Sequence, residues 1–196
     1  MFPDGLYGGT FDPIHLGHCF AAERVRQAFR MKAVRMVLSA NPPHKEAKSE
    51  SIRHRWEMLE LACEDYPNLV PDDSEIRWGS SYTIDTLKSF GEAHGASNFF
   101  WILGQDSFVT LSEWRDWQQI LHYCSLIVVD RSIDSGLVAK HKQRLLKESR
   151  AIKNARDNIG AVCVLDLAMP EISSSDIRKR LREGHSTEGL LDSKVA

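Results

Sequence analysis

Short apolar runs alternate with longer amphipathic segments along the whole chain. The short runs are apolar throughout and end at glycine, proline or acidic residues, which is typical of buried strands. Strands are expected at residues 2–7, 33–40, 69–71, 98–103, 125–130 and 161–165. Between them, apolar residues recur at helical spacing. Helices are expected at residues 16–30, 52–63, 82–94, 137–150 and 174–183.

This alternation of strands and helices predicts one α/β domain with a Rossmann-like sheet. Strands that are apolar on both sides form parallel sheets with helices on both faces. We expect an open parallel sheet within a single domain at residues 1–183, with a small C-terminal helical appendage, and a mobile tail at residues 184–196. Ligands bind outside the carboxyl ends of such strands. The polar residues that follow strands are therefore the candidates for function.

Charge and cysteine content exclude several classes of protein. The 196 residues include 25 Lys and Arg against 27 Asp and Glu, a net charge of −2, which excludes a generic nucleic-acid binder and a polybasic membrane binder. No apolar run has the length of a transmembrane helix, and residues 1–5 do not resemble a signal peptide. The four cysteines are far apart and form no C-x-x-C pair. We therefore expect a cytoplasmic protein with reduced thiols, without disulfides or a zinc site.

The first candidate site follows the first strand. Residues 8–18 read G-G-T-F-D-P-I-H-L-G-H, which is neither a P-loop nor a G-x-G-x-x-G motif. Gly8 and Gly9 let the backbone approach a ligand closely, and the start of the helix that follows suits a phosphate. His15 and His18 are three residues apart, so both rings can lie on one side of the helix and donate hydrogen bonds to one polyphosphate.

The second candidate site follows the last expected strand. Residues 172–178 read I-S-S-S-D-I-R and open the last helix. Capping that helix needs only one of the three serines. Arg178 lies in the first turn, where its planar guanidinium can reach an anion held at the helix start. Both candidate sites therefore suit phosphate, and we expect the two ends of the chain to meet on one nucleoside triphosphate.

The two motifs resemble the signatures of the H-x-G-H nucleotidyltransferase superfamily. Further segments, in the same order, are similar to those of bacterial nicotinate-nucleotide adenylyltransferases: N-P-P-H-K at 41–45, S-Y-T-I-D-T-L at 81–87, G-Q-D at 104–106 and W-R-D-W at 114–117. The resemblance spans residues 5–183. It implies transfer of the adenylyl group of ATP to nicotinate mononucleotide, which gives deamido-NAD and pyrophosphate in NAD biosynthesis. It also implies Mg²⁺ bound mainly by phosphate oxygens, with no metal site made by the protein alone.

The resemblance assigns roles to individual residues. His15, His18 and Arg178 would stabilise the transition state. The residues implied to hold ATP are Gly8, Gly9, Thr10, Phe11, His15, His18, Gly104, Asp106, Ile172, Ser173, Ser174 and Arg178. The residues implied to hold the mononucleotide are Lys45, Tyr82, Thr83, Trp117 and Arg131. Trp117 would stack on the nicotinate ring, and backbone N–H groups near Thr83 would bind its carboxylate. This arrangement favours the acid over the amide.

Three alternative functions are compatible with parts of the sequence. A phosphopantetheine adenylyltransferase would share the two outer motifs but would not need the middle segments. A regulatory nucleotide-binding module without turnover is disfavoured by the intact His15, His18 and Arg178. A fragment of a tRNA synthetase is disfavoured because neither an anticodon-binding domain nor a broad basic surface is evident. The sequence does not decide between a monomer and a homo-oligomer.

Overall fold

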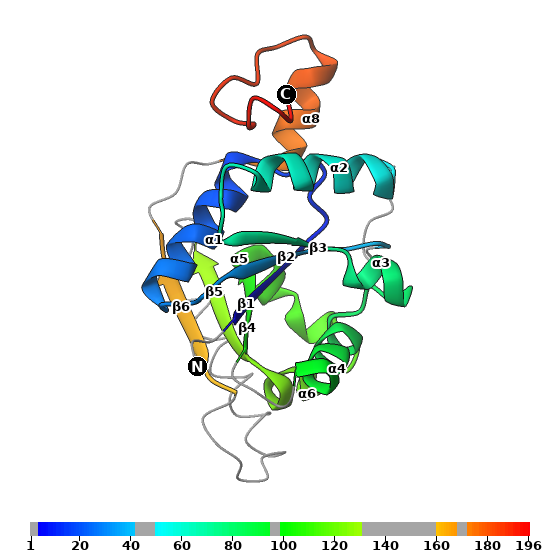
Figure 1. Cartoon of the computed structure of the whole chain (residues 1–196), viewed down its shortest axis with the longest axis vertical. Helices are drawn as coiled ribbons and strands as arrows, with labels where there is room; N and C mark the ends of the chain where they lie inside the picture. The colour runs from blue at the N-terminus through cyan, green and yellow to red at the C-terminus, as the bar shows by residue number, and fades with distance from the viewer. Residues whose placement is uncertain (1–3, 42–49, 95–98, 131–159, 168–171) are drawn as a thin grey trace.

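The protein folds around one open sheet of six parallel strands, as expected for a Rossmann-like domain. The computed structural model describes residues 4–41, 50–94, 99–130, 160–167 and 172–196. The strands lie in the order β3-β2-β1-β4-β5-β6 (Figure 1). Their bounds are β1 (Asp4–Gly9), β2 (Val34–Leu38), β3 (Leu69–Asp72), β4 (Phe99–Gly104), β5 (Ser125–Asp130) and β6 (Val162–Asp166). Each neighbouring pair is parallel.

Successive side chains of each strand enter one of two cores on opposite faces of the sheet. Leu6 and Val37 pack on the face covered by α4 (Thr83–His94) and α6 (Trp117–Tyr123). Tyr7 and Met36 pack on the other face, which α1 (Leu16–Ala28) and α2 (Ile52–Cys63) cover (Figure 1). Burial on both faces explains why most positions of the strands are apolar rather than every second one.

Several helices are short. They are α3 (Ser74–Trp78), α5 (Gln105–Val109) and the 3₁₀ helix η1 (Leu111–Glu113). A longer helix, α8 (Ser174–Arg182), follows the last strand. α3 occupies residues for which the sequence predicted no helix. Asp106 lies in the first turn of α5, and Gly104 stands at its N-cap. The helix expected at 137–150 lies outside the described residues.

The C-terminal segment at residues 184–196 packs against the domain, although a mobile tail was expected. The backbone N–H of Leu16 donates to the carbonyl of Leu190 over 3.0 Å. Leu191 is buried with residues of α8 and of the segment that precedes it. The Lys194 ammonium contacts Asp65 at 2.7 Å. The tail thus joins α8 to the start of α1 and the end of α2 (Figure 1).

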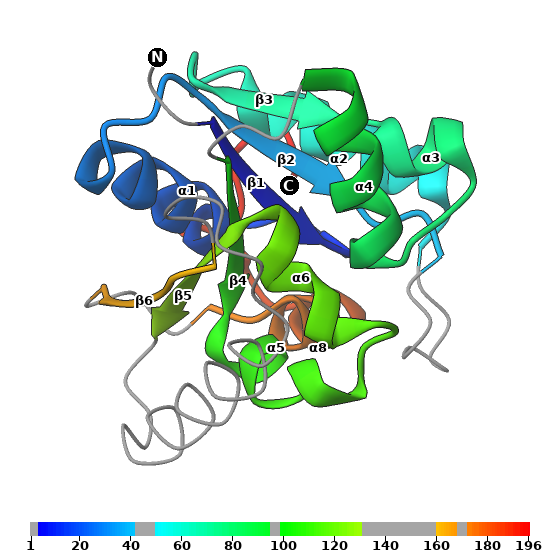
Figure 2. The same ribbon diagram turned by 90° about the horizontal axis from the view of Figure 1, so that it is seen from below.

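The order of the strands indicates where a ligand binds. The chain builds outward from β1 in one direction with β2 and β3, and in the other with β4, β5 and β6. The carboxyl ends of β1 and β4 therefore flank the topological switch point, where parallel α/β sheets bind ligands. Figure 2 shows β1 and β4 side by side at the centre of the sheet. Among the residues described, no helix has the length and apolar character needed to cross a membrane.

Candidate functional site

The two histidines form a stacked pair at the start of α1. Their ring centroids lie 3.7 Å apart, and His15, at the N-cap, is buried. The backbone N–H of His15 donates to Nδ1 of His18 over 3.3 Å. Because Nδ1 accepts this hydrogen bond, the neutral His18 ring carries its proton on Nε2. His18 is therefore oriented to donate a hydrogen bond from Nε2.

Gly17 makes room for this histidine pair. A Cβ atom at position 17 would lie 3.0 Å from Nδ1 of His15, which is closer than side chains ordinarily approach. The glycine in the H-x-G-H motif therefore serves the packing of the ring before it. The edge of Phe11 also contacts His18, with centroids 5.2 Å apart. Phe11 itself adopts a left-handed backbone, with φ of 47°, and this sharp turn directs the chain from β1 toward α1.

The N-terminus of α8 is bound to the loop that precedes the histidines. Arg178 Nη1 donates to the carbonyl of Asp12 and lies 3.6 Å from its carboxylate oxygen Oδ2. The Ser174 hydroxyl donates to the carbonyl of Pro13 over 3.0 Å. Ser173 caps the helix by accepting from the N–H of Asp176 over 3.1 Å. The two motifs, from opposite ends of the chain, thus meet at one loop.

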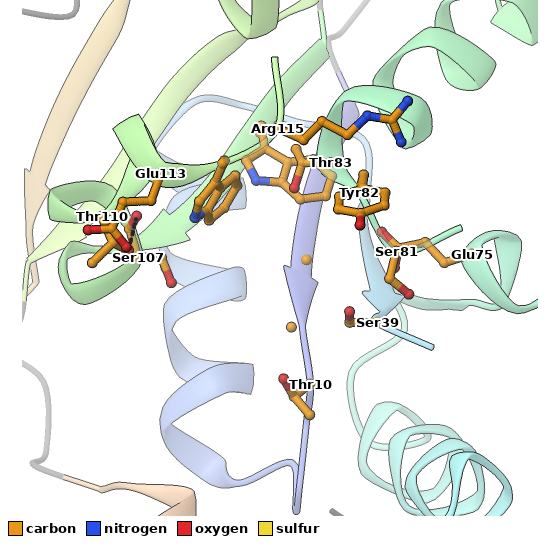
Figure 3. Close-up of a pocket in the computed structure, with 14 residues that line it drawn as sticks. Thr10, Ser39, Glu75, Ser81, Tyr82, Thr83, Ser107, Thr110, Glu113 and Arg115 are labelled. Carbon is orange, nitrogen blue, oxygen red and sulfur yellow. Dashed lines mark hydrogen bonds between the residues drawn. The ribbon is translucent and has the colours of Figure 1, made fainter. Parts of the chain in front are cut away.

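A cavity of about 340 Å³ opens beside this loop, at the carboxyl ends of β1 and β2. Its volume falls within the usual range for small-molecule sites. Figure 3 shows it with the side chains that surround it. The lining residues are Gly8, Gly9, Thr10, Ser39, Glu75, Ser81, Tyr82, Thr83, Trp101, Ser107, Thr110, Glu113, Trp114 and Arg115. Of the residues expected in the site, Gly8, Gly9, Thr10, Tyr82 and Thr83 are among them.

Trp101 and Trp114 line the cavity, and Trp117 does not. Trp117 is the first residue of α6 and is 8% exposed within the core. Trp114 ends η1 with an extended backbone, and Asp116 then turns the chain through a left-handed conformation with φ of 50°. This turn directs Trp117 into the core, while Trp114 faces the cavity. Trp117, expected from the sequence to stack on the nicotinate ring, therefore does not line this cavity, whereas its neighbour Trp114 does.

Arg115 and Tyr82 lie together at the rim of the cavity (Figure 3). The Arg115 guanidinium carbon is 4.8 Å from the centroid of the Tyr82 ring, a cation–π contact. Arg115 Nη1 also lies 3.3 Å from the carboxylate of Asp85 in α4. These contacts join the 82–85 segment to the segment between η1 and α6.

Arg55, which the sequence analysis did not single out, fixes the backbone of two loops around the site. Its guanidinium is buried and donates to the carbonyls of Thr10 at 2.9 Å, Ser39 at 2.7 Å and Ala40 at 3.0 Å. Its Nε donates to the carbonyl of Glu50 over 3.1 Å. Burial lowers the pKa of this guanidinium, although an arginine remains charged. The end of β2 and the loop after β1 are therefore held together by one side chain.

Glu75 is a second residue of the site that the sequence analysis did not identify. Its carboxyl group lines the cavity and is 3% exposed. Thr86 Oγ1 donates to its Oε1 over 2.8 Å. Burial raises the pKa of this carboxyl to about 7, because the charged form is poorly solvated there. No sequence pattern marks a carboxylate in a five-residue helix as buried.

The remaining expected residues lie near the cavity or outside the described chain. His15, His18, Ser174 and Arg178 adjoin it through the loop after Thr10 without lining it. Gly104 and Asp106 stand where β4 passes into α5. Ile172 and Ser173 line a separate cavity along α8. Lys45 and Arg131 lie outside the described residues, as does His44.

The chain is similar in sequence and in fold to known nucleotidyltransferases. The model of the cytidylyltransferase-like family matches residues 6–180. A probable nicotinate-nucleotide adenylyltransferase of Geotalea uraniireducens is 36% identical over 199 residues, covering 97% of this chain and 92% of the relative. The corresponding protein of Shewanella woodyi is 32% identical over 197 residues, covering 97% and 93%. A Plasmodium falciparum nicotinic acid mononucleotide adenylyltransferase complexed with NaAD has a similar fold, with a TM-score of 0.77 at 18% identity, covering 100% and 93%.

Proposed function

The chain belongs to the nicotinate-nucleotide adenylyltransferases of the cytidylyltransferase-like family, and we propose on this premise that it transfers the adenylyl group of ATP to nicotinate mononucleotide. The products are deamido-NAD and pyrophosphate. One observation carries the assignment of roles within the site. The N-termini of α1 and α8 meet at the loop after β1, and the cavity opens beside the same loop. A triphosphate and a mononucleotide phosphate can therefore lie next to each other.

The nucleophile in this reaction is the phosphate of the mononucleotide. Its second pKa is about 6, so it is ionised at neutral pH and needs no strong base. A phosphate oxygen attacks the α-phosphorus of ATP, a new P–O bond forms, and the bond to the β-phosphate oxygen breaks. The electron pair leaves with pyrophosphate. Catalysis then consists of bringing two anions together and neutralising the charge that develops on the leaving group.

We infer that the histidine pair and α8 bind the triphosphate. Nε2 of His18 is oriented as a donor, since the His15 backbone occupies Nδ1. The first turn of α8 offers backbone N–H groups and the positive end of a helix dipole. Arg178 already lies beside the loop through its contact with Asp12. Its guanidinium has further N–H groups that can donate to phosphate oxygens. Each of these groups donates hydrogen bonds or carries positive charge, which suits the departure of pyrophosphate.

We infer that the cavity binds the nicotinate half of the mononucleotide. Trp101, Trp114 and Tyr82 provide aromatic surfaces for a flat ring. Thr83 opens α4 at the cavity wall, and the first N–H groups of a helix bind a carboxylate well. An amide would carry no negative charge toward this helix end. We therefore propose that the enzyme prefers nicotinate mononucleotide to nicotinamide mononucleotide.

Nucleotidyltransferases of this kind use a divalent metal, and we propose Mg²⁺ bound to ATP as the form of the substrate. Within the described ranges no cluster of three His, Cys, Asp or Glu side chains could hold a metal ion. Mg²⁺ commonly keeps several waters and binds through substrate phosphates, so this arrangement suits a metal that arrives with ATP. We also infer a cytoplasmic enzyme, because its four cysteines are free, and three of them are buried.

The test is pyrophosphate release with ATP, Mg²⁺ and a panel of second substrates. We expect turnover with nicotinate mononucleotide, slower turnover with nicotinamide mononucleotide and none with phosphopantetheine. The product should have the mass of deamido-NAD. Faster turnover with phosphopantetheine, or binding of ATP without turnover of any of the three, would reject this function.

A further inference from the structure

Glu75 is a buried acid in the wall of the substrate cavity whose presence the reaction does not by itself explain. It lies in α3, which packs against β2, and its side chain points toward Ser81 and Ser39 (Figure 3). An acid in this position is costly to charge unless a cation or several donors compensate it. The groups around it therefore decide which protonation state the folded protein holds.

Hydroxyl groups and main chain face the Glu75 carboxyl, and the charged side chains near it that the structure describes are paired elsewhere. Thr86 donates to Oε1 over 2.8 Å. Ser81, Ser39 and the backbone of Ala40 also act to lower the pKa of the carboxyl, but burial outweighs them. Oε2 is buried and has no hydrogen-bond partner among the described residues. The charged residues of the neighbouring elements pair among themselves: Arg77 with Asp73, Arg35 with Asp72, Asp85 with Arg115, and Arg55 with main-chain carbonyls.

The neutral acid and the carboxylate differ in the hydrogen bonds that they can form. A carboxylate only accepts hydrogen bonds, whereas the neutral acid has one O–H donor as well. Glu75 therefore accepts from Thr86 in both states but donates only when neutral. Since burial raises its pKa to about 7, it changes from mostly neutral to mostly charged as pH rises past neutrality.

Glu75 supports the segment that faces the nicotinate ring. Its main-chain carbonyl accepts from the N–H of Gly79 over 3.0 Å, and its side chain binds Thr86 in α4. Between these two points, Ser81 Oγ accepts from the backbone N–H of Asn41 over 2.6 Å, which joins the segment to the end of β2. Residues 81–83 thus lie between the end of α3, which carries Glu75, and Thr86, to which the Glu75 side chain is bound.

We propose that Glu75 is a positioning residue. As a neutral acid it holds residues 81–83 in place, and these residues in turn bind the mononucleotide. Ionisation would remove the O–H donor and place a negative charge, with no cationic partner among the described residues, behind the segment that receives an anionic substrate. Mononucleotide binding at alkaline pH is therefore coupled to uptake of a proton by Glu75. This inference rests on the proposed function for the identity of the substrate, and ATP, bound at the helix starts, should be affected less.

The first test compares the wild type with Glu75→Gln, which keeps the shape and a donor but cannot ionise. KM for nicotinate mononucleotide, KM for ATP and kcat are measured from pH 6 to pH 9. In the wild type, KM for the mononucleotide should rise by up to about tenfold between pH 6 and pH 8 relative to the variant, as expected for one ionising group with a pKa near 7. Titration of the substrate phosphate affects both enzymes equally, so it cancels in the ratio of their KM values at each pH. KM for ATP should show no such difference.

Two further variants separate positioning from a general effect on the fold. Glu75→Leu removes both the charge and the bond to Thr86, so KM for the mononucleotide should be raised at every pH, without the alkaline rise. Glu92→Gln removes an exposed carboxylate from α4 and should reproduce the wild-type profile. If Glu75→Gln shows the same alkaline rise as the wild type, Glu75 does not couple binding to protonation.

The second test requires only the wild-type protein. Calorimetry of nicotinate mononucleotide binding at pH 8, in buffers with different ionisation enthalpies, should reveal uptake of about one proton. The substrate phosphate is already ionised at this pH. Binding without proton uptake would overturn the proposal even if the variants failed to fold. Proton-linked binding without turnover would instead reject the proposed function and leave the role of Glu75 intact.

Discussion

At the scale of single residues, the site depends on side chains whose orientation is fixed by neighbours. The backbone of His15 fixes the tautomer of His18, and Gly17 leaves room for the His15 ring. The two histidines were identified as candidates from sequence because a strand and a Gly-Gly turn precede them, whereas the role of Gly17 was not. Trp114 and Glu75 were not, because their positions depend on a left-handed turn at Asp116 and on burial of α3. Neither feature leaves a signal in the sequence.

Replacing His18 tests the donor role. His18→Ala should lower kcat by at least about 10²-fold, the usual effect of losing one preoriented donor to a developing charge. KM for the mononucleotide should change little, because that substrate occupies the cavity. Steady-state kinetics with both substrates measure this. His122→Ala, an exposed histidine in α6, is the matched control, and an equal loss in both variants would contradict a specific role of His18.

The two tryptophans provide a matched pair. Trp114→Ala should raise KM for nicotinate mononucleotide more than KM for ATP, because Trp114 lines the cavity. Trp117→Ala should chiefly destabilise the fold, by about 3–5 kcal/mol, as truncation of a buried aromatic residue does. Kinetics and thermal unfolding separate the two effects. A selective effect of Trp117→Ala on KM for the mononucleotide, at unchanged stability, would restore the original assignment.

At the scale of elements, the sheet could be predicted more fully than the helices around the site. The strands are continuous apolar runs, and the predicted ranges overlap the six observed strands. The short helices α3, α5 and α6 could not be predicted in the same way. Helices of this length are too short to show a clear period, and isolated ones are unstable, so tertiary packing determines them. They include the elements that carry Glu75 and Trp117.

The start of α1 offers a test at this scale. Gly17→Ala should lower kcat by about tenfold, because the added Cβ must displace the His15 ring by a few tenths of an ångström and so misplace a reacting group. The free energy of unfolding should stay the same or rise slightly, since alanine is more favourable than glycine in a helix by about 1 kcal/mol. Kinetics and denaturant unfolding are measured together. Unchanged kcat would mean that the ring accommodates the methyl group without consequence.

At the scale of the whole molecule, the site is assembled from both ends of the chain. Arg178 and Ser174 bind the loop at Asp12 and Pro13, and the tail supplies the Leu190 carbonyl to the N–H of Leu16. The sequence indicated that the two motifs would meet, because both suit phosphate. It did not indicate that the tail packs, because residues 184–196 lack a periodic pattern. The tail packs through the side chains of Leu190, Leu191 and Val195.

Weakening the tail should therefore affect the distant histidines. Leu191→Ala should destabilise the fold by about 2–5 kcal/mol, as expected for a buried leucine, and should also lower kcat, because α1 loses part of its support. Lys194→Ala removes ion pairs that are exposed to solvent, so it should change the stability much less than Leu191→Ala does. Thermal unfolding and kcat at 25 °C are the measurements. A destabilised Leu191→Ala protein with normal kcat would show that the tail contributes to stability alone.

The contact between Leu16 and Leu190 also has a consequence for biosynthesis. Translation produces the histidine motif first and its supporting carbonyl nearly last. A ribosome-bound chain can form the early strands but cannot complete this contact at the start of α1 until Leu190 has emerged. Chains that terminate before Leu190 should accordingly lose activity even when most of the domain has folded.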